Sequence, residues 1–230
     1  MQLAGLDIGT SGCKITVFEQ DGTMLGRIYK DYPVSRTSSE HEIDAAHIWR
    51  TVSEVMTKAA EEYTDIAGIG IASFGETFVL LDENDCPICN SMIYTDPRGE
   101  EECQYITNVV GKEKLSRITG LNPHAMYSIP KLMWIKNNRP ELYQKTAKIF
   151  LIGDYVIYML TGKAQIDYSL ASRTMAFDIN KLEWSGEIMQ AARIDTALFS
   201  NPVAVGTSAG TMYGELIEKF RFKSDVAVVS

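Results

Sequence analysis

The stretch of sequence that decides the fold is Leu3-Ala4-Gly5-Leu6-Asp7-Ile8-Gly9-Thr10-Ser11-Gly12-Cys13-Lys14. It predicts a buried strand, a tight turn with two glycines and a second strand that begins near Cys13. Because glycine has no Cβ, Gly9 and Gly12 permit positive φ values and the close backbone approach that a polyphosphate needs. We therefore expect a phosphate-binding turn, and the alternative is a plain hairpin in which Asp7 is a turn former.

Four side chains in and around this turn have the chemistry of a phosphate and metal site. Thr10 and Ser11 supply hydroxyl groups, and Lys14 supplies a positive point charge. The carboxylate of Asp7 is suited to holding a hydrated Mg²⁺ ion. We expect all four residues to lie near the phosphates, with Asp7 reaching the metal ion through water.

Three consecutive strands are predicted to open the fold. They cover residues 3–9, 13–19 and 24–32, and Asp21-Gly22 is a hairpin signal between the last two. These strands form a meander in which each neighbour runs antiparallel to the last.

A crossover helix and a buried strand are predicted next. Asp44 is the expected N-cap of a helix that runs to about Tyr63. One face of this helix repeats apolar residues at helical spacing: Ile48, Val52, Val55, Met56 and Ala59. Residues 66–72 then read as a fully buried strand. A meander followed by a crossover helix and a parallel strand indicates a ribonuclease-H-like α/β core with a mixed sheet flanked by helices.

The middle of the chain, from about residue 85 to residue 200, is predicted to be a large helical insertion into this core without a linker on either side. A strand at 78–82 comes before it. The expected helices cover residues 98–110, 112–118, 130–137, 140–145 and 153–160.

A helix at 213–222 and a last strand at 225–229 are predicted to end the chain. No helix follows to cover that strand, so it is either an edge strand or a core strand of a chain that continues beyond Ser230. We favour continuation.

Composition limits the classes of function. The chain has 230 residues, of which 45% are hydrophobic and 23% charged, as in a soluble globular protein. Its net charge of −8 argues against nucleic-acid binding, which needs a basic face. No apolar stretch approaches the length of a membrane span, and we expect a cytoplasmic protein.

The four cysteines do not form a disulfide framework, because they are few and scattered. Cys86 and Cys89 have redox or zinc-ligand spacing, but no second Cys/His pair follows and they do not open a helix. We assign them no role.

Several segments resemble the N-terminal domain of the FGGY family of carbohydrate kinases. Residues 126–138, Met-Tyr-Ser-Ile-Pro-Lys-Leu-Met-Trp-Ile-Lys-Asn-Asn, match the first signature of that family at each constrained position. The segments at 154–162 and 167–175, followed by Trp184, look like its next block. The resemblance covers essentially the whole chain.

This resemblance implies a two-domain enzyme of the actin-like ATPase fold that moves the γ-phosphoryl of ATP to a hydroxyl of a sugar or polyol. Residues 1–230 would be the domain that binds the sugar and carries the phosphate turn, with ATP and Mg²⁺ as cofactors. The general base of the family is an Asp after a Gly-Gly pair, which is expected just beyond Ser230. The nucleotide domain is then absent from this chain, and this chain alone is expected to be inactive. A homodimer stays open.

The resemblance also implies sugar contacts from two segments. One is the turn after the buried strand, with Gly75, Glu76 and Thr77, and the other carries Tyr94 and Asp96. Glycerol kinases have Arg-Glu where this chain has Gly75-Glu76, so the cation is expected to be lost and the freed space to admit a ketose or polyol of about four to six carbons. A lone Glu in a turn is otherwise a solvated surface charge.

Other residues of these segments are interpreted as structural and not as functional. Lys131 and Trp134 lie three apart on one predicted helix face and are expected to pack as scaffold, with the lysine reaching solvent. Arg173 is read as an anchor of a helix or loop and not as a ligand. The three histidines have no triad partners, so none is given a catalytic role.

Two rival functions remain on the same core fold. A two-metal nuclease needs several converging carboxylates, and Asp7 has no evident acidic partner. A non-catalytic sugar-binding or assembly module is the second rival.

Overall fold

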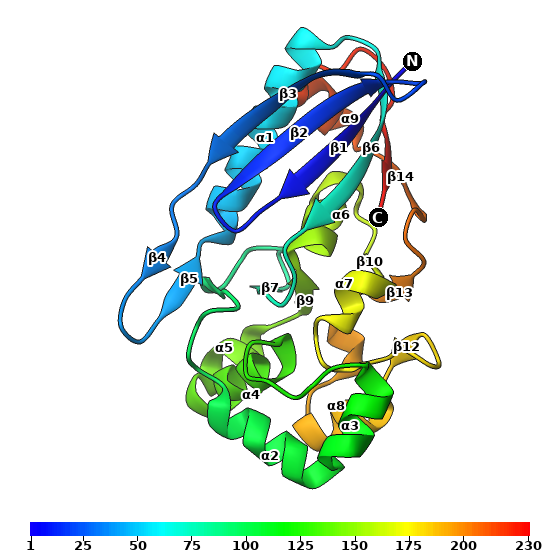
Figure 1. Cartoon of the computed structure of the whole chain (residues 1–230). Coiled ribbons are helices and arrows are strands. Elements are labelled where there is room, and N and C mark those ends of the chain that lie inside the picture. Colours follow the sequence, from blue (N-terminus) through cyan, green and yellow to red (C-terminus); the bar gives the residue numbers. More distant parts are fainter.

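The structure, a computed structural model, describes every residue from Met1 to Ser230. Figure 1 shows a sheet-based part that carries both termini and a helical part at the opposite end. The two parts have separate hydrophobic cores, of 34 and 25 buried residues. The predicted insertion is therefore large enough to bury a core of its own.

A six-stranded mixed sheet in the order β14-β15-β6-β1-β2-β3 forms the first part. β1, β2 and β3 are antiparallel neighbours, and β6 and β15 run parallel to β1 on its other side. The strands of this sheet are β1 (Gln2–Ile8), β2 (Gly12–Glu19), β3 (Met24–Asp31), β6 (Ile66–Ser73), β14 (Ser208–Thr211) and β15 (Ala227–Val229). The order and directions confirm the predicted ribonuclease-H-like core.

The last strand is not an edge strand, because β15 pairs with β6 on one side and with β14 on the other. The edge-strand alternative is therefore wrong. Sequence reasoning missed β14, a short strand whose Gly210 has a positive φ of 96°.

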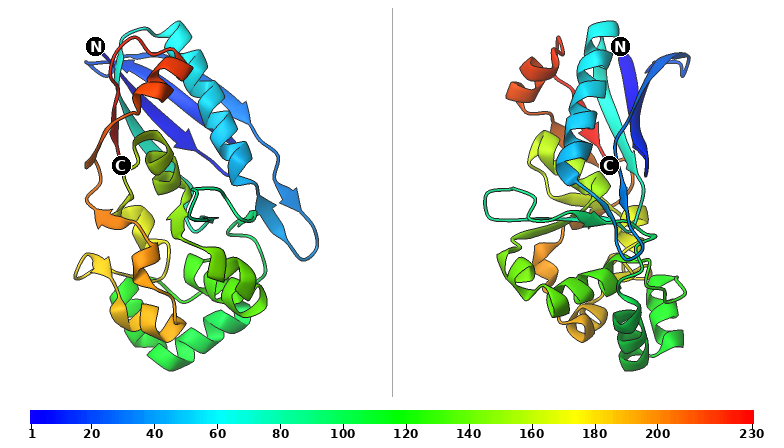
Figure 2. Two further views of the ribbon diagram at one scale, coloured as in Figure 1. Left: turned by 180° about the vertical axis from the view of Figure 1, so that it is seen from behind. Right: turned by 90° about the vertical axis from the view of Figure 1, so that its left-hand side faces the viewer.

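Helices cover one face of the sheet. Helix α1 (Ala45–Glu62) begins as predicted, with the Asp44 side chain accepting a hydrogen bond of 2.8 Å from the backbone N–H of Ala46. Its apolar face is buried in the core under the sheet. The right-hand view in Figure 2 shows α1, α6 (Ile152–Thr161) and α9 (Gly214–Phe220) on the same side of the sheet. Burial of this face stabilises the sheet in the arrangement that carries the site.

A two-stranded ribbon of β7 (Phe78–Leu81) and β9 (Lys148–Leu151) connects the sheet to the helical part. The helices of that part are α2 (Glu100–Val110), α3 (Lys112–Thr119), α4 (Ser128–Asn138), α5 (Pro140–Lys145), α7 (Tyr168–Ser172) and α8 (Gly186–Ala192), with a 3-10 turn at Thr196–Leu198. All five helices predicted for the middle of the chain are present, with bounds that differ by at most two residues. The prediction missed α7 and α8, and shortness alone does not explain this, because the six-residue α5 was predicted.

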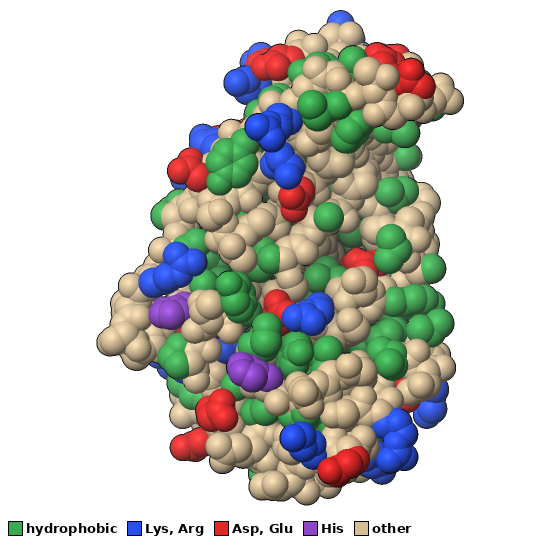
Figure 3. All heavy atoms as spheres, in the orientation of Figure 1, with side chains coloured by type: hydrophobic (Ala, Val, Ile, Leu, Met, Phe, Trp, Pro, Cys, Tyr) green, Lys and Arg blue, Asp and Glu red, His purple; other side chains and the backbone are tan.

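Three small sheets complete the fold. Their strands are β4 (Ser35–Arg36), β5 (His41–Ile43) and β8 (Ser91–Met92); β10 (Gln165–Asp167) and β13 (Asn201–Val203); and β11 (Phe177–Asp178) and β12 (Glu183–Trp184). None of the helices is both long and apolar enough to cross a membrane. On the face in Figure 3, basic and acidic side chains are interspersed.

Candidate functional site

The two turns that the sequence singled out leave the same edge of the sheet. β1 and β6 are parallel with Ile8 opposite Ser73, and the backbone N–H of Phe74 donates to the Ile8 carbonyl at 2.9 Å. In the next strand, Val229 lies opposite Gly70, which brings Ser230 to this edge as well. Because the carboxyl ends of parallel strands meet at one edge, residues 9–12 and 74–77 are neighbours in space.

The turn at 9–12 is tight for a steric reason. The N–H of Gly9 donates to the carbonyl of Gly12 at 2.9 Å, and a Cβ on Gly12 would lie 2.7 Å from the Lys30 carbonyl and against the Tyr29 hydroxyl. Neither glycine has a positive φ, so the expectation of a left-handed conformation was wrong. Gly12 is needed because the neighbouring strand approaches closely.

Asp7 and Lys14 form a cross-strand pair at the base of this turn. They are register partners in β1 and β2, and the Lys14 ammonium lies 3.0 Å from an Asp7 oxygen. Both side chains remain about half exposed, while the neighbouring Thr10 is partly buried and Ser11 is exposed. A single exposed carboxylate beside hydroxyl groups fits a hydrated Mg²⁺, which keeps several waters and takes one or two carboxylates plus phosphate oxygens.

Glu76 is held in an unusual backbone conformation beside a cation. Its φ of 65° lies in the left-handed region that favours glycine, and its side chain is only 7% exposed. Arg173 donates to Glu76 Oε1 through Nε at 2.7 Å and also through Nη2. The expectation that this chain lacks a cation beside Glu76 was therefore wrong, because a residue 97 positions away supplies it.

Arg173 also fills the space beside Gly75. A Cβ on Gly75 would lie 2.8 Å from the Arg173 Cγ and 3.1 Å from its Cβ. The size argument for a larger substrate loses its basis, because the volume next to Gly75 is occupied by this arginine. Arg173 anchors the turn at 74–77, and its partner is the predicted sugar-binding residue Glu76.

The signature segment at the start of α4 supports the same turn. The Ser128 hydroxyl, fully buried, donates to the Glu76 carbonyl at 2.7 Å. The guanidinium of Arg173 lies 5.2 Å from the ring centroid of Tyr127, within the range of a cation–π contact. Glu76 is thereby fixed through both its backbone and its side chain.

Thr77 is fully buried, its Oγ1 has no hydrogen-bond partner, and its N–H donates to the Gly75 carbonyl at 2.7 Å. Tyr94, by contrast, is exposed and open to a ligand.

The Asp96 carboxylate is already saturated. It accepts from Arg98 Nε at 2.9 Å and Nη2 at 2.7 Å, from the Arg98 N–H at 3.0 Å and from the His41 N–H at 2.8 Å, and its side chain has no exposed area. Burial alone would raise the pKa of Asp96, but these hydrogen bonds outweigh it and lower the pKa. The structure therefore gives Asp96 the role of fixing its own loop, not of facing a sugar.

Lys131 fixes the same loop from α4. Its ammonium donates to the carbonyls of Asp96 at 2.6 Å and Arg98 at 3.1 Å, and burial lowers its pKa to about 8. The guanidinium of Arg98 lies 5.0 Å from the ring centroid of Trp134. Lys131 and Trp134 are scaffold as expected, but the lysine does not reach solvent.

A pocket of about 360 Å³ opens at this edge of the sheet, between the ends of β6 and β15 and the start of α6. Its polar lining is formed by Ser73, Asp154, Asp167, Ser169, Arg173 and Ser230, with Gly75 beside them. A pocket of this volume suits a small ligand.

Sequence reasoning missed Asp154, a fully buried carboxyl in the pocket wall. It accepts from the Ser200 hydroxyl at 2.6 Å, its other oxygen has no side-chain or backbone partner at hydrogen-bond distance, and burial raises its pKa well above the usual range. The segment that begins at Asp154 resembles a block of the family, but its helical pattern alone does not distinguish this residue from a surface Asp in the first turn of a helix.

Cys86 and Cys89 lie in the loop after β7, and both thiols are free. Burial raises the pKa of Cys89 to about 11, which is the opposite of what a reactive thiolate needs.

Comparison with known proteins identifies the family. The family described as "FGGY family of carbohydrate kinases, N-terminal domain" matches residues 2–230. A xylulose kinase of Lactococcus lactis is 28% identical over 229 residues, which cover 97% of this chain and 46% of that protein. Glycerol kinase 2 of Saccharolobus solfataricus is 35% identical over 211 residues, 85% of this chain and 42% of that protein.

Solved structures show the same fold. A ligand-bound xylulose kinase from Lactobacillus acidophilus aligns with a TM-score of 0.93 at 24% identity, over 99% of this chain and 47% of that one. Plasmodium falciparum glycerol kinase with ADP aligns with a TM-score of 0.91 at 21% identity, over 100% of this chain and 47% of that one. The chain spans about half the length of the relatives it matches. It belongs to the FGGY family of carbohydrate kinases.

Proposed function

We propose that this chain is the N-terminal domain of a two-domain kinase that transfers the γ-phosphoryl group of ATP to a hydroxyl of a sugar or polyol. The observation that carries the proposal is the adjacency of the turn at 9–12 and the turn at 74–77 at one sheet edge, in a chain that matches this family along its length. Phosphoryl transfer depends mainly on positioning and charge neutralisation, so a phosphate-binding turn beside a hydroxyl-binding turn is the arrangement it needs.

The turn at 9–12 is the proposed phosphate site. The hydroxyls of Thr10 and Ser11 donate to phosphate oxygens, and Lys14 contributes positive charge. Asp7 holds a water of the Mg²⁺ ion, which neutralises charge on the phosphates when it is bound. We assign the general base to none of the described residues; by family resemblance it is an Asp that follows a Gly-Gly pair after β15.

The turn at 74–77 and the exposed Tyr94 are the proposed sugar site. An aromatic ring suits the apolar face of a sugar, and the Glu76 carboxylate accepts hydrogen bonds from hydroxyls. Asp96 orients the segment that carries Tyr94, and the fully buried Thr77 supports the turn from inside the fold. Relatives named xylulose kinase and glycerol kinase support a ketose or polyol as substrate.

We further propose that the protein works in the cytosol, since free cysteines suit a reducing compartment.

The test is the turnover of full-length Asp7→Asn and Thr10→Ala variants. We expect turnover at least about tenfold below wild type with smaller changes in sugar affinity, because both side chains act on phosphate and metal. ADP release is followed over a panel of sugars and polyols, with the exposed Asp31→Asn as the control. If Asp7→Asn stays within about twofold of wild type, Asp7 is only a turn residue. Sugar binding without turnover by the wild type would favour the non-catalytic module instead.

A further inference from the structure

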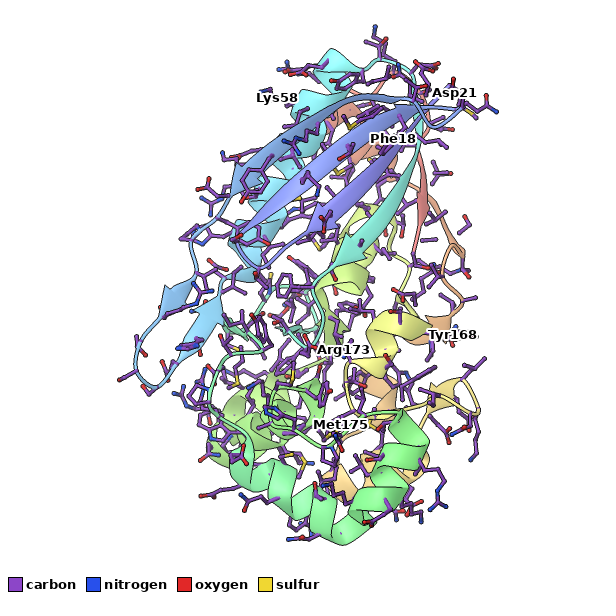
Figure 4. All side chains as sticks on the ribbon, in the orientation of Figure 1. Phe18, Asp21, Lys58, Tyr168, Arg173 and Met175 are labelled. Atoms are coloured by element: carbon purple, nitrogen blue, oxygen red, sulfur yellow. The ribbon has the colours of Figure 1, made fainter.

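The pair formed by Glu76 and Arg173 leaves one acceptor and one donor unused. Both hydrogen bonds between the two side chains end on Glu76 Oε1, so Oε2 accepts no hydrogen bond and Arg173 Nη1 donates none. The arginine side chain is 37% exposed and lines the pocket at the sheet edge together with Gly75 and Ser73. Figure 4 shows Arg173 at the junction between the sheet and the helical part.

We propose that Glu76 and Arg173 together bind two neighbouring hydroxyls of the substrate, an inference that rests on the proposed function. Glu76 Oε2 accepts the hydrogen of one hydroxyl, and Arg173 Nη1 donates to the oxygen of the next. A carboxylate can only accept and a guanidinium can only donate, so the pair fits adjacent hydroxyl groups that each do one of the two.

The charge of the pair selects the class of substrate. Glu76 and Arg173 neutralise each other, so the subsite carries no net charge for a substrate anion to bind. A sugar acid would bring its carboxylate against that of Glu76, which is unfavourable in a nearly buried position. The substrate is therefore a neutral sugar or polyol with a vicinal diol.

Gly75 is a specificity residue in this arrangement because it makes room for the arginine. A side chain at this position would meet Arg173 Cγ at 2.8 Å and push the guanidinium away from Glu76. The ring of Tyr127 limits the alternative positions of the guanidinium on another side. A glycine at 75 and an arginine at 173 are thus coupled through space.

The first experiment measures sugar affinity in the full-length protein by calorimetry, with xylulose, ribulose, erythritol, glycerol and gluconate as ligands. We expect Arg173→Met to raise the Kd of the best neutral ligand roughly 10- to 100-fold, the range for a hydrogen bond to a charged group. The KM for ATP should stay within about twofold of wild type. The matched control is Arg221→Met, which removes the arginine of an exposed pair with Glu61 and should change neither value.

The second experiment separates a contact from a structural effect. Monodeoxy analogues of the best ligand are compared in wild type and Arg173→Met; the variant should lose its discrimination for one hydroxyl position only. Gly75→Ala should weaken binding as Arg173→Met does, and the double variant should be no weaker than Arg173→Met alone. The control is Gly186→Ala, whose Cβ meets no atom within 4 Å.

Three results overturn the inference while leaving the proposed function intact: an active wild type whose Arg173→Met affinity is unchanged, equal discrimination of all deoxy analogues by both proteins, or tighter binding of gluconate than of every neutral ligand. If Arg173→Met does not fold, Arg173→Gln, which keeps a donor at shorter reach, takes its place in the same comparison. A wild type that phosphorylates no sugar refutes the proposed function instead.

Discussion

Arg98 offers a quantitative test of how the loop that carries Tyr94 is held. Its side chain is 11% exposed, and it contacts Asp96 at 2.7 and 2.9 Å, Glu42 at 2.6 Å and Glu40 at 3.3 Å. Methionine at 98 would keep most of the apolar stem but remove the cation. The Asp96 carboxylate, with no exposed area, would then lose its ion-pair partner and two of its hydrogen bonds.

The expected loss of stability follows from the burial of the two partners. Removing one member of a buried ion pair typically costs about 3–5 kcal/mol, and the more exposed Glu40 adds about 0–1 kcal/mol. For a chain of this size each kcal/mol shifts Tm by about 2–4 °C, so a total loss of about 3–6 kcal/mol should make Arg98→Met melt about 6–24 °C below wild type at pH 7. Thermal and urea unfolding at pH 7 measure it.

The pH dependence of this loss has a definite sign. Because the bonds from Arg98 and two backbone N–H groups lower the pKa of Asp96 in the fold, the stabilisation is present above the usual Asp range and is lost as pH falls through the folded pKa. The deficit of Arg98→Met should therefore shrink toward acid pH.

The control for Arg98→Met is Lys114→Met, which breaks a half-exposed pair with Glu187 and should cost about 0–1 kcal/mol. An Arg98→Met loss no larger than that of Lys114→Met, or a deficit that stays constant as pH falls below about 4, would refute the argument.

Two other predictions concern the buried carboxyl and the isolated domain. Burial raises the pKa of the Asp154 carboxyl, so its contribution to the stability of the fold is complete below the unfolded-state pKa of about 4 and is lost as pH rises through the folded-state pKa. Asp154→Asn should therefore gain stability relative to wild type as pH rises toward 7. Urea unfolding that gives the same difference in stability at every pH would contradict this. The 230-residue chain alone should give no sugar-dependent ADP release, since losing a general base typically costs about 10²- to 10⁴-fold and losing nucleotide positioning costs more; measurable sugar-dependent turnover by this chain would show the assignment of the base to be wrong.

Local patterns in the sequence were enough to predict five of the six strands of the sheet, its crossover helix and the turn at 9–12. The strand–turn–strand at 3–14 and the apolar face of residues 48–59 depend on neighbours within a few residues, which the sequence displays directly. Short elements such as α8 depend on their caps and on tertiary packing; the Ser185 side chain caps α8 but produces no period.

The details of the site could not be predicted, because they depend on contacts between distant positions. Nothing in the spacing of residues 76 and 173 indicates that they pair, so the cation beside Glu76 was overlooked. The same is true of Lys131, whose helical position suggested a solvent-exposed tip while its ammonium in fact binds two carbonyls of another loop. Burial of a charge is a tertiary property, and a single sequence carries little information on it.

The position of the phosphate turn was predicted correctly, but the reason given for its two glycines was wrong. The glycines were expected for their freedom at positive φ, but the turn closes with ordinary φ values. Gly12 is instead fixed by the approach of β3, where the Lys30 carbonyl leaves no room for a Cβ. Sequence alone does not distinguish these two uses of glycine.

The most direct test of the central claim is to identify the phosphorylated product. The full-length protein is incubated with ATP, Mg²⁺ and a mixture of neutral ketoses, polyols and gluconate, and each sugar is examined by mass spectrometry for the gain of one phosphoryl group. We predict that one or a few neutral sugars or polyols are phosphorylated, that gluconate is not, and that Asp7→Asn forms product at least about tenfold more slowly. ATP consumption without any phosphorylated sugar, or product formation at an equal rate by Asp7→Asn, would contradict the claim.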